Sequence, residues 1–346
     1  MLFLGAGASK PLGVPTMKGF TEAVLKDLEK RGAHYEHLVA SIKNYISNLG
    51  IEPDIEAVLT ILEGKANPRK NLENLAAQQM VFPEEFSEAS EKTVAWVALN
   101  EIEDSIYNIC SGVIPQLATR VYAKLWETLS RSLSVPVRGG GRTILQPGSL
   151  VKRIFTTNYD LSLEIFLRSQ GIIFDEGFRQ DASGLSFADE WSRDGVQLVK
   201  LHGSINYYLM EGGKVVKSNA PLKHTDIYGE RVTEQMMIYP MGEKYATRLP
   251  FYELLGQLRS SLFTEPFCIV IGYSFRDTAI NNAFLDAVRV NPQLRVMLVS
   301  PHADRALESL DPNLRPRVGA LSGELGNELL PQAIAEEIAL VHPPLF

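Results

Sequence analysis

The stretch Leu2-Phe3-Leu4-Gly5-Ala6-Gly7-Ala8-Ser9 decides the fold, because a short apolar run leads directly into a glycine-rich turn. A helical pattern begins near Thr16, after a second turn at Gly13-Val14-Pro15. A strand, a glycine turn and a helix in this order are typical of the opening of a nucleotide-binding α/β sheet. The start of the chain therefore predicts a sheet that binds a ligand near the end of its first strand.

The rest of the chain divides into a helical stretch and a stretch in which strands alternate with helices. From Thr16 to about Arg131 apolar residues recur at intervals of three and four, which predicts helices. Apolar runs of strand length follow, and the helical patterns between them include Leu161–Gln170, Tyr252–Phe263 and Thr278–Val290. The predicted strands are Val151–Thr156, Ile172–Phe174, Val196–Leu201, Met236–Tyr239, Phe267–Ile271 and Arg295–Val299.

Several of these runs are continuously apolar, as central parallel strands covered on both faces should be. We therefore predict an α/β fold: a Rossmann-like doubly wound parallel sheet with an inserted all-helical module. Residues 1–31 and 150–346 are predicted to form the Rossmann-like domain, and residues 32–149 the helical insertion module.

Composition limits the class of protein. The chain has 346 residues, 45% of them hydrophobic and 22% charged, so wholesale disorder and fibrous repeats do not fit. With 34 basic and 41 acidic residues the net charge is −7, which gives no overall basic field for nucleic acid, and no direct nucleic-acid binding is expected. Only two cysteines occur, so a four-thiolate zinc site is excluded. No apolar run approaches the roughly 18 residues of a membrane span, and we expect a cytoplasmic protein.

The glycine turn by itself is a weak indication of function. Its backbone could approach a diphosphate while the following helix presents N–H groups. The dehydrogenase pattern needs a third glycine where this chain has Lys10, so hydride transfer is disfavoured. A tight turn that binds no ligand is the alternative.

Polar groups follow three later strands. Thr157, Asn158 and Asp160 come directly after Val151–Thr156, at the end of the strand where ligands of such sheets lie, although Asn158 or Asp160 could instead cap the next helix. His202 follows Val196–Leu201 and could act as a base near neutral pH or be a structural residue.

The third polar group follows Phe267–Ile271 in a turn that begins with Gly272. Ser274 and Arg276 in this turn could hold phosphate or ribose oxygens. In the structural alternative, Ser274 caps a helix next to an Arg276–Asp277 pair.

In order and spacing, these elements resemble the sirtuin series of NAD-binding motifs. The matching segments are Gly5-Ala6-Gly7-Ala8-Ser9 with Gly13-Val14-Pro15, Thr157-Asn158-Tyr159-Asp160, Leu201-His202-Gly203 and Gly272-Tyr273-Ser274. The resemblance implies that Gly5, Ala6, Gly7 and Ser9 cradle the NAD diphosphate and that Asn158, with Asp160 and Thr157 beside it, orients the nicotinamide ribose and a water. It further implies that His202 is the base, and that the turn from Gly272 to Ser274 contacts the phosphate and adenosine side.

The sequence also departs from protein-deacylating sirtuins. It has no cysteine pairs for their structural zinc, it has Thr16-Met17-Lys18 where they have Asp-Phe-Arg, and Thr157 stands where they have glutamine. The large helical insertion and the zinc-free sequence are instead similar to sirtuin-like effector domains of bacterial anti-phage defence. That resemblance implies depletion of NAD, a homo-oligomer, and a separate partner such as a HerA-type ATPase or an Argonaute.

The sequence therefore predicts an NAD+ glycohydrolase that cleaves the nicotinamide–ribose bond with NAD as substrate and without zinc. Asn158 and His202 are the predicted catalytic residues, with Asp160 in either an electrostatic or a structural role. The alternatives are an NAD-dependent protein deacylase or ADP-ribosyltransferase, and a non-catalytic module that senses NAD or ADP-ribose. An assembly subunit with an inherited sheet is a further alternative.

Overall fold

A computed structural model describes most of the chain. The described residues are 1–66, 79–82, 91–132, 136–139, 142–145, 151–182, 184–192, 194–222, 233–237 and 249–341. The remaining parts of the predicted helical module lie outside these ranges. So do residues 150, 183, 193, 223–232, 238–248 and 342–346 of the predicted Rossmann-like domain, which include residues 238–239 of the predicted strand Met236–Tyr239.

The centre of the molecule is a seven-stranded sheet in which every neighbouring pair is parallel. Its strands, in spatial order, are β14 (Val318–Ser322), β13 (Arg295–Ser300), β12 (Phe267–Ile271), β1 (Leu2–Leu4), β4 (Arg153–Thr156), β8 (Val196–Lys200) and β5 (Phe174–Asp175). The short strand β1 lies in the middle, where Leu2 pairs with Ile269 of β12 and Ile154 of β4. Two paired neighbours and complete burial stabilise this three-residue strand.

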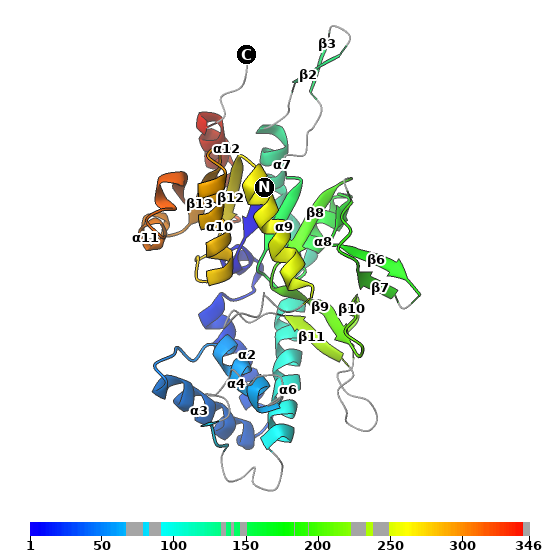
Figure 1. Cartoon of the computed structure of the whole chain (residues 1–346), viewed down its shortest axis with the longest axis vertical. Helices are drawn as coiled ribbons and strands as arrows, with labels where there is room; N and C mark the ends of the chain where they lie inside the picture. The colour runs from blue at the N-terminus through cyan, green and yellow to red at the C-terminus, as the bar shows by residue number, and fades with distance from the viewer. Residues whose placement is uncertain are drawn as a thin grey trace.

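Helices cover both faces of the sheet, which confirms the predicted doubly wound α/β class (Figure 1). Successive side chains of a strand point to opposite faces, and β1 shows the result. Phe3 belongs to a core cluster with α9 (Phe251–Thr264) and α10 (Thr278–Val290). Leu2 and Leu4 belong to a second cluster, which includes residues of α7 (Pro115–Ser132), α8 (Ser162–Ser169) and α12 (Leu330–Val341). Helix α11 (Ala303–Ser309) packs beside β13 and β14.

The helical part of the chain gathers at the lower end of the view in Figure 1. It consists of α2 (Met17–Glu29), α3 (Ala33–Asn48), α4 (Ile55–Ala66) and α6 (Glu91–Ser111). Helix α2 packs against α3, α4 and α6, whereas α7 packs against α8 and α12 beside the sheet. Their apolar side chains join the same cluster as Leu2 and Leu4, so the helices and the sheet share one hydrophobic core. Within the described ranges, no helix is both long and apolar enough to cross a membrane.

A second sheet was not predicted from the sequence. It is antiparallel, with the order β11 (Thr233–Met237), β9 (Gly203–Met210), β10 (Val215–Lys217), β7 (Gly184–Phe187) and β6 (Phe178–Asp181). The predicted strand Met236–Tyr239 overlaps β11 and therefore belongs to this sheet, not to the parallel one. The predicted loop Pro136–Gly148 also contains paired strands, β2 (Pro136–Gly139) and β3 (Arg142–Leu145). Most of these strands have three to five residues, too few for a clear alternation, and buried polar residues interrupt the pattern of the longer β9.

Candidate functional site

The four motifs that follow β1, β4, β8 and β12 meet at one edge of the parallel sheet. Backbone hydrogen bonds link neighbouring strand ends: Gly5 N–H to Ile271 O at 2.9 Å, Thr157 N–H to Leu4 O at 3.1 Å and Leu201 N–H to Thr156 O at 2.8 Å. All four strands are parallel, so their carboxyl ends necessarily lie at the same edge. The topology therefore brings together motifs that are far apart in the sequence.

The glycine turn packs directly on the turn that begins with Gly272. A Cβ on Gly5 would lie 2.6 Å from the Gly272 carbonyl oxygen, and one on Gly7 would lie 2.8 Å from the Gly272 Cα. Gly7 N–H also donates to Gly272 O at 2.9 Å. The N–H groups of Gly5 and Gly7 are thus engaged within the protein, and an immediate reason for both glycines is the close approach of two backbones.

Asn158, Ser9 and Asp160 form one hydrogen-bonded network. The Asn158 amide donates to Gly5 O at 3.0 Å and to Ser9 Oγ at 2.8 Å, and Ser9 Oγ donates to Asp160 Oδ2 at 2.6 Å. Asp160 Oδ1 accepts from the backbone N–H of Ser162 at 2.9 Å, in the first turn of α8. Both N–H groups of Asn158 are therefore used, and Oδ1 is the atom that it can offer to a hydroxyl or a water.

A buried lysine fixes the turn that carries Asn158. Lys200, at the end of β8, donates to Asp160 O at 2.6 Å and to Tyr159 O at 3.3 Å, and it pairs with Glu164 Oε1 at 2.9 Å. The Lys200 and Glu164 side chains are 1% and 2% exposed. Removing either partner would leave a charge buried without compensation, so this pair ties the β4 turn to β8.

His202 is also buried, and it is paired with an acid that the sequence interpretation placed only at a helix start. Its Nε2 lies 3.1 Å from Asp277 Oδ2. Asp277 Oδ1 accepts from the backbone N–H of Ile280 at 2.9 Å, so Asp277 is the N-cap of α10. The alternative in which Ser274 caps this helix is therefore wrong. The sequence did contain an indication, because an aspartate directly preceding a predicted helix is a common N-cap.

Two tyrosines belong to the motifs of this site, one next to Asn158 and one after β12. The Tyr159 ring centroid lies 6.4 Å from that of His202. Burial raises the pKa of Tyr159 well above its usual value, and the nearby carboxylates of Glu56 and Asp277 raise it further. Burial, with Asp277 and Glu56 nearby, raises the pKa of Tyr273 in the same way. Glu56 belongs to α4, so the helical part of the chain also reaches this region.

The Tyr273 hydroxyl is buried; it makes no hydrogen bond of good geometry with the described residues, but it lies close enough to the Asp277 backbone for that contact to lower its pKa. The side chain is 7% exposed and its backbone lies against Gly5. By contrast, Ser274 and Arg276 of the same turn are exposed to solvent.

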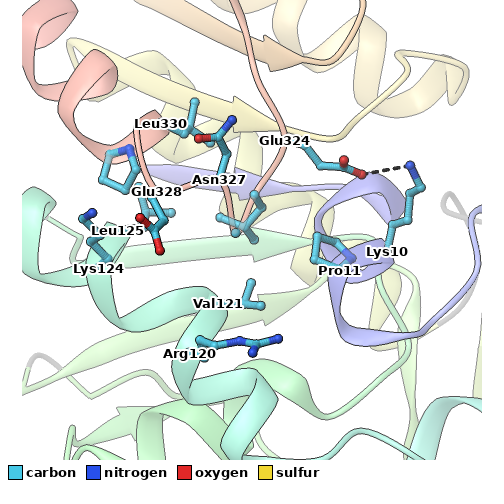
Figure 2. A pocket seen from close by; sticks show the side chains of 13 residues that line it. Lys10, Pro11, Arg120, Val121, Lys124, Leu125, Glu324, Asn327, Glu328 and Leu330 are labelled. Atoms are coloured by element: carbon cyan, nitrogen blue, oxygen red, sulfur yellow. Dashed lines mark ion pairs between the residues drawn. The ribbon is translucent and has the colours of Figure 1, made fainter.

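A cavity of about 810 Å³ lies beside the glycine turn, not at the predicted catalytic residues (Figure 2). It is lined by Lys10 and Pro11, by one face of α7, and by the segment from Glu324 to Pro331. Lys10 and Glu324 form an ion pair at 2.9 Å. None of the predicted site residues lines this cavity.

No cluster of three or more His, Cys, Asp or Glu side chains suited to a metal ion occurs in the part of the chain that the structure describes. Cys110 and Cys268 are both buried as free thiols.

Comparison with known proteins relates part of the chain to one family. Residues 152–317 match the family model described as SIR2-like domain, which is just under half of the chain. No curated protein sequence matches the chain.

Similar solved structures include a variant Sir2 homologue in complex with ADP-ribose, with 14% identity and a TM-score of 0.46 over 100% of this chain and 94% of that one. A Sir2 homologue in complex with NAD has 15% identity and a TM-score of 0.46 over 98% and 89%. A Sir2 bound to acetylated peptide has 14% identity and a TM-score of 0.42 over 98% and 92%.

Proposed function

We propose that this protein is a sirtuin-like NAD+ hydrolase that releases nicotinamide and ADP-ribose. One observation carries the proposal: an asparagine and a histidine end adjacent parallel strands, β4 and β8, next to a glycine turn packed on the Gly272 turn. Its support from the comparisons is the match of residues 152–317 to the SIR2-like domain model.

In the proposed reaction the bond between the ribose C1′ and the nicotinamide nitrogen breaks, and its electron pair neutralises the cationic ring. A water oxygen forms the new bond to C1′, and His202 takes the proton from that water directly or through a ribose hydroxyl. Asn158 presents Oδ1 to the sugar or the water, because Gly5 O and Ser9 Oγ occupy its amide donors. Asp160 accepts hydrogen bonds on both carboxylate oxygens. Of its two predicted roles, electrostatic and structural, these contacts support the structural role.

The diphosphate and adenosine side of NAD is proposed to lie over the two packed turns. The exposed Arg276 and Ser274 offer a guanidinium and a hydroxyl to phosphate or ribose oxygens. The N–H groups of Gly5, Gly7, Gly272 and Thr157 already donate within the protein, so Ala6 is the residue of the glycine turn that we propose offers its backbone N–H to the ligand. We propose no zinc requirement for this chemistry.

We further propose that the reaction depletes NAD+ in anti-phage defence in the cytoplasm. A homo-oligomer, and a partner such as a HerA-type ATPase or an Argonaute, belong to this proposal and rest on the sequence resemblance alone. Transfer of ADP-ribose or removal of an acyl group would break the same bond, but would need a protein or peptide acceptor. A sensing module would bind NAD without releasing nicotinamide.

The test is incubation of the purified protein with NAD+ alone, and then with a candidate partner, followed by chromatography of nicotinamide and ADP-ribose. We expect Asn158→Ala and His202→Ala to lower turnover by about 10²- to 10⁴-fold, the usual contribution of a positioned base. His302→Ala is the matched control, because His302 is exposed and follows β13.

Wild-type turnover in both site variants would refute the assignment of these residues. Release of nicotinamide only when an acyl-lysine peptide is added would support the deacylase instead.

A further inference from the structure

The contact between His202 and Asp277 joins two motifs that lie on different strands. His202 follows β8, Asp277 follows β12, and they are 75 residues apart in the chain. Their side chains are 7% and 4% exposed. The buried imidazole and the buried carboxylate lie 3.1 Å apart and form a hydrogen bond. Because both groups are shielded from solvent, water does not compete for this bond.

Asp277 is held in place by more than His202. Its second oxygen accepts the Ile280 N–H at 2.9 Å, where the positive end of the α10 dipole favours a negative charge. An aromatic cluster fixes the turn that carries Asp277. In this cluster the centroid of the Phe275 ring lies 4.9 Å from that of Tyr273 and 5.3 Å from that of Phe284. Phe275 itself has a φ of 54°, a strained conformation that this packing maintains.

From this geometry we infer that Asp277 is a positioning residue that selects the tautomer of His202 and fixes its ring. A carboxylate can only accept a hydrogen bond, so the imidazole proton lies on Nε2 and the lone pair on Nδ1. Nδ1 is then the nitrogen that takes the proton. This inference rests on the proposed hydrolysis for its catalytic consequence, but the tautomer itself does not depend on that function.

The proton balance follows from this arrangement. The proton released by water or by a ribose hydroxyl moves to Nδ1, and the ring becomes an imidazolium with a proton on each nitrogen. Asp277 stabilises that cation and keeps no proton of its own. Nδ1 gives up the proton to solvent when the products leave, which restores the starting tautomer.

A purely structural role for Asp277 is the alternative, since it also caps α10. Two substitutions separate the roles, because asparagine and serine are both good N-caps. Asp277→Asn keeps an acceptor for the Ile280 N–H but presents an N–H group to Nε2, which reverses the tautomer. Asp277→Ser keeps a cap but is too short to repeat the contact with His202.

The experiment measures the His202 tautomer by ¹⁵N NMR of the ligand-free protein, with its signals assigned by their loss in His202→Ala. We expect the proton on Nε2 in the wild type and on Nδ1 in Asp277→Asn. We also expect kcat for NAD+ to fall by about 10²- to 10⁴-fold in Asp277→Asn and Asp277→Ser, with KM near wild type and both variants still folded. The matched control is Asp286→Asn, on the same helix, which removes a surface carboxylate paired with Arg259.

An unchanged tautomer with unchanged kcat in Asp277→Asn would overturn the inference. Loss of the folded state in both cap-preserving variants would also overturn it in favour of a structural role. If the tautomer reverses but no preparation releases nicotinamide, the positioning of His202 by Asp277 stands and the proposed hydrolysis fails.

Discussion

At the scale of single residues, Ser9 determines how Asn158 is presented. Its hydroxyl accepts a hydrogen bond from the Asn158 amide and donates one to Asp160. One small side chain thus provides hydrogen bonds to two residues of a turn that lies about 150 residues later in the chain. Ser9 is 2% exposed, and water cannot readily replace it. The orientation of Asn158 thus depends on a residue that need not touch a ligand at all.

We predict that Ser9→Ala lowers the free energy of unfolding by about 1–3 kcal/mol, because a buried amide donor and a carboxylate oxygen each lose a partner. Urea unfolding of the purified variant measures this change. Ser169→Ala serves as the control: Ser169 is exposed, and water can replace the hydrogen bonds of its hydroxyl with Phe166 O, Thr119 and Gln170, so we expect a change within about 0.5 kcal/mol. Equal midpoints for the two variants would contradict the role assigned to Ser9.

The sequence could predict the position of Asn158 and His202 because each directly follows an apolar strand. It could not predict that Asp277 pairs with His202, or that Lys200 holds the Tyr159 and Asp160 carbonyl oxygens. Those contacts depend on which strands are neighbours in the sheet. A local sequence pattern does not determine the order of parallel strands in a sheet. The role of a polar residue at a strand end therefore needs the topology as well as the motif.

At the scale of elements, the glycine turn after β1 and the turn after β12 act as one interlocked unit. Each approaches the other closely enough that a Cβ on Gly7 meets the Gly272 Cα at 2.8 Å and one on Gly272 meets the Ala8 nitrogen at 2.4 Å. Gly272 also has a φ of 67°, which favours glycine. The glycine pattern predicts a bound diphosphate, whereas the close approach of the two backbones already requires glycine at these positions.

Gly7→Ala tests this packing, because alanine normally stabilises a helical position. We expect the opposite sign here, a loss of about 1–3 kcal/mol of unfolding free energy, since the two turns must move apart. Gly256→Ala is the matched comparison: Gly256 is an exposed residue of α9, no atom would contact its Cβ, and we expect a gain of about 0.5–1 kcal/mol. Chemical denaturation of both variants measures whether each substitution raises or lowers the free energy of unfolding. A Gly7→Ala protein more stable than the wild type would rule out the packing requirement.

Elements with an unbroken apolar pattern were predicted well, and elements whose pattern is interrupted by polar residues were predicted poorly. The helix predicted over Thr278–Val290 has these bounds in the structure, and β12 matches Phe267–Ile271, because each has an unbroken pattern and clear flanking residues. The antiparallel sheet was missed, although β9 begins at Gly203, immediately after His202. Buried polar residues such as Ser204 and Asn206 interrupt the apolar pattern of β9, so its strand character depends on pairing with β10 and β11.

At the scale of the whole molecule, burial places several weak acids where they cannot ionise easily. Burial raises the pKa of the Cys268 thiol to about 12, from an ordinary value of 9.0. Burial also raises the pKa of Cys110, Tyr122, Tyr159, Tyr207 and Tyr273. These groups are spread over the sheet, the helices around it and the antiparallel sheet, so their effect belongs to the fold as a whole.

The sign of the pH dependence follows from these raised values. Below about pH 9 both the folded and the unfolded chain keep the Cys268 proton, and the full stability is present. Above pH 9 the unfolded chain releases the proton while the folded protein retains it up to about pH 12, so stability is lost as the pH rises through that window. Each such group contributes a slope of up to about 1.4 kcal/mol per pH unit. We therefore predict that the free energy of unfolding in urea falls steeply between pH 9 and pH 11.

Cys268→Ala isolates the contribution of one group to this decline. The variant loses some packing in β12 at every pH, but its unfolded state has one ionisable thiol fewer. Its stability should therefore fall more gradually than that of the wild type above pH 9, so that the two curves approach each other as the pH rises. Urea titrations at several pH values measure both curves, and parallel curves would mean that the Cys268 thiol ionises as easily in the folded protein as in the unfolded chain.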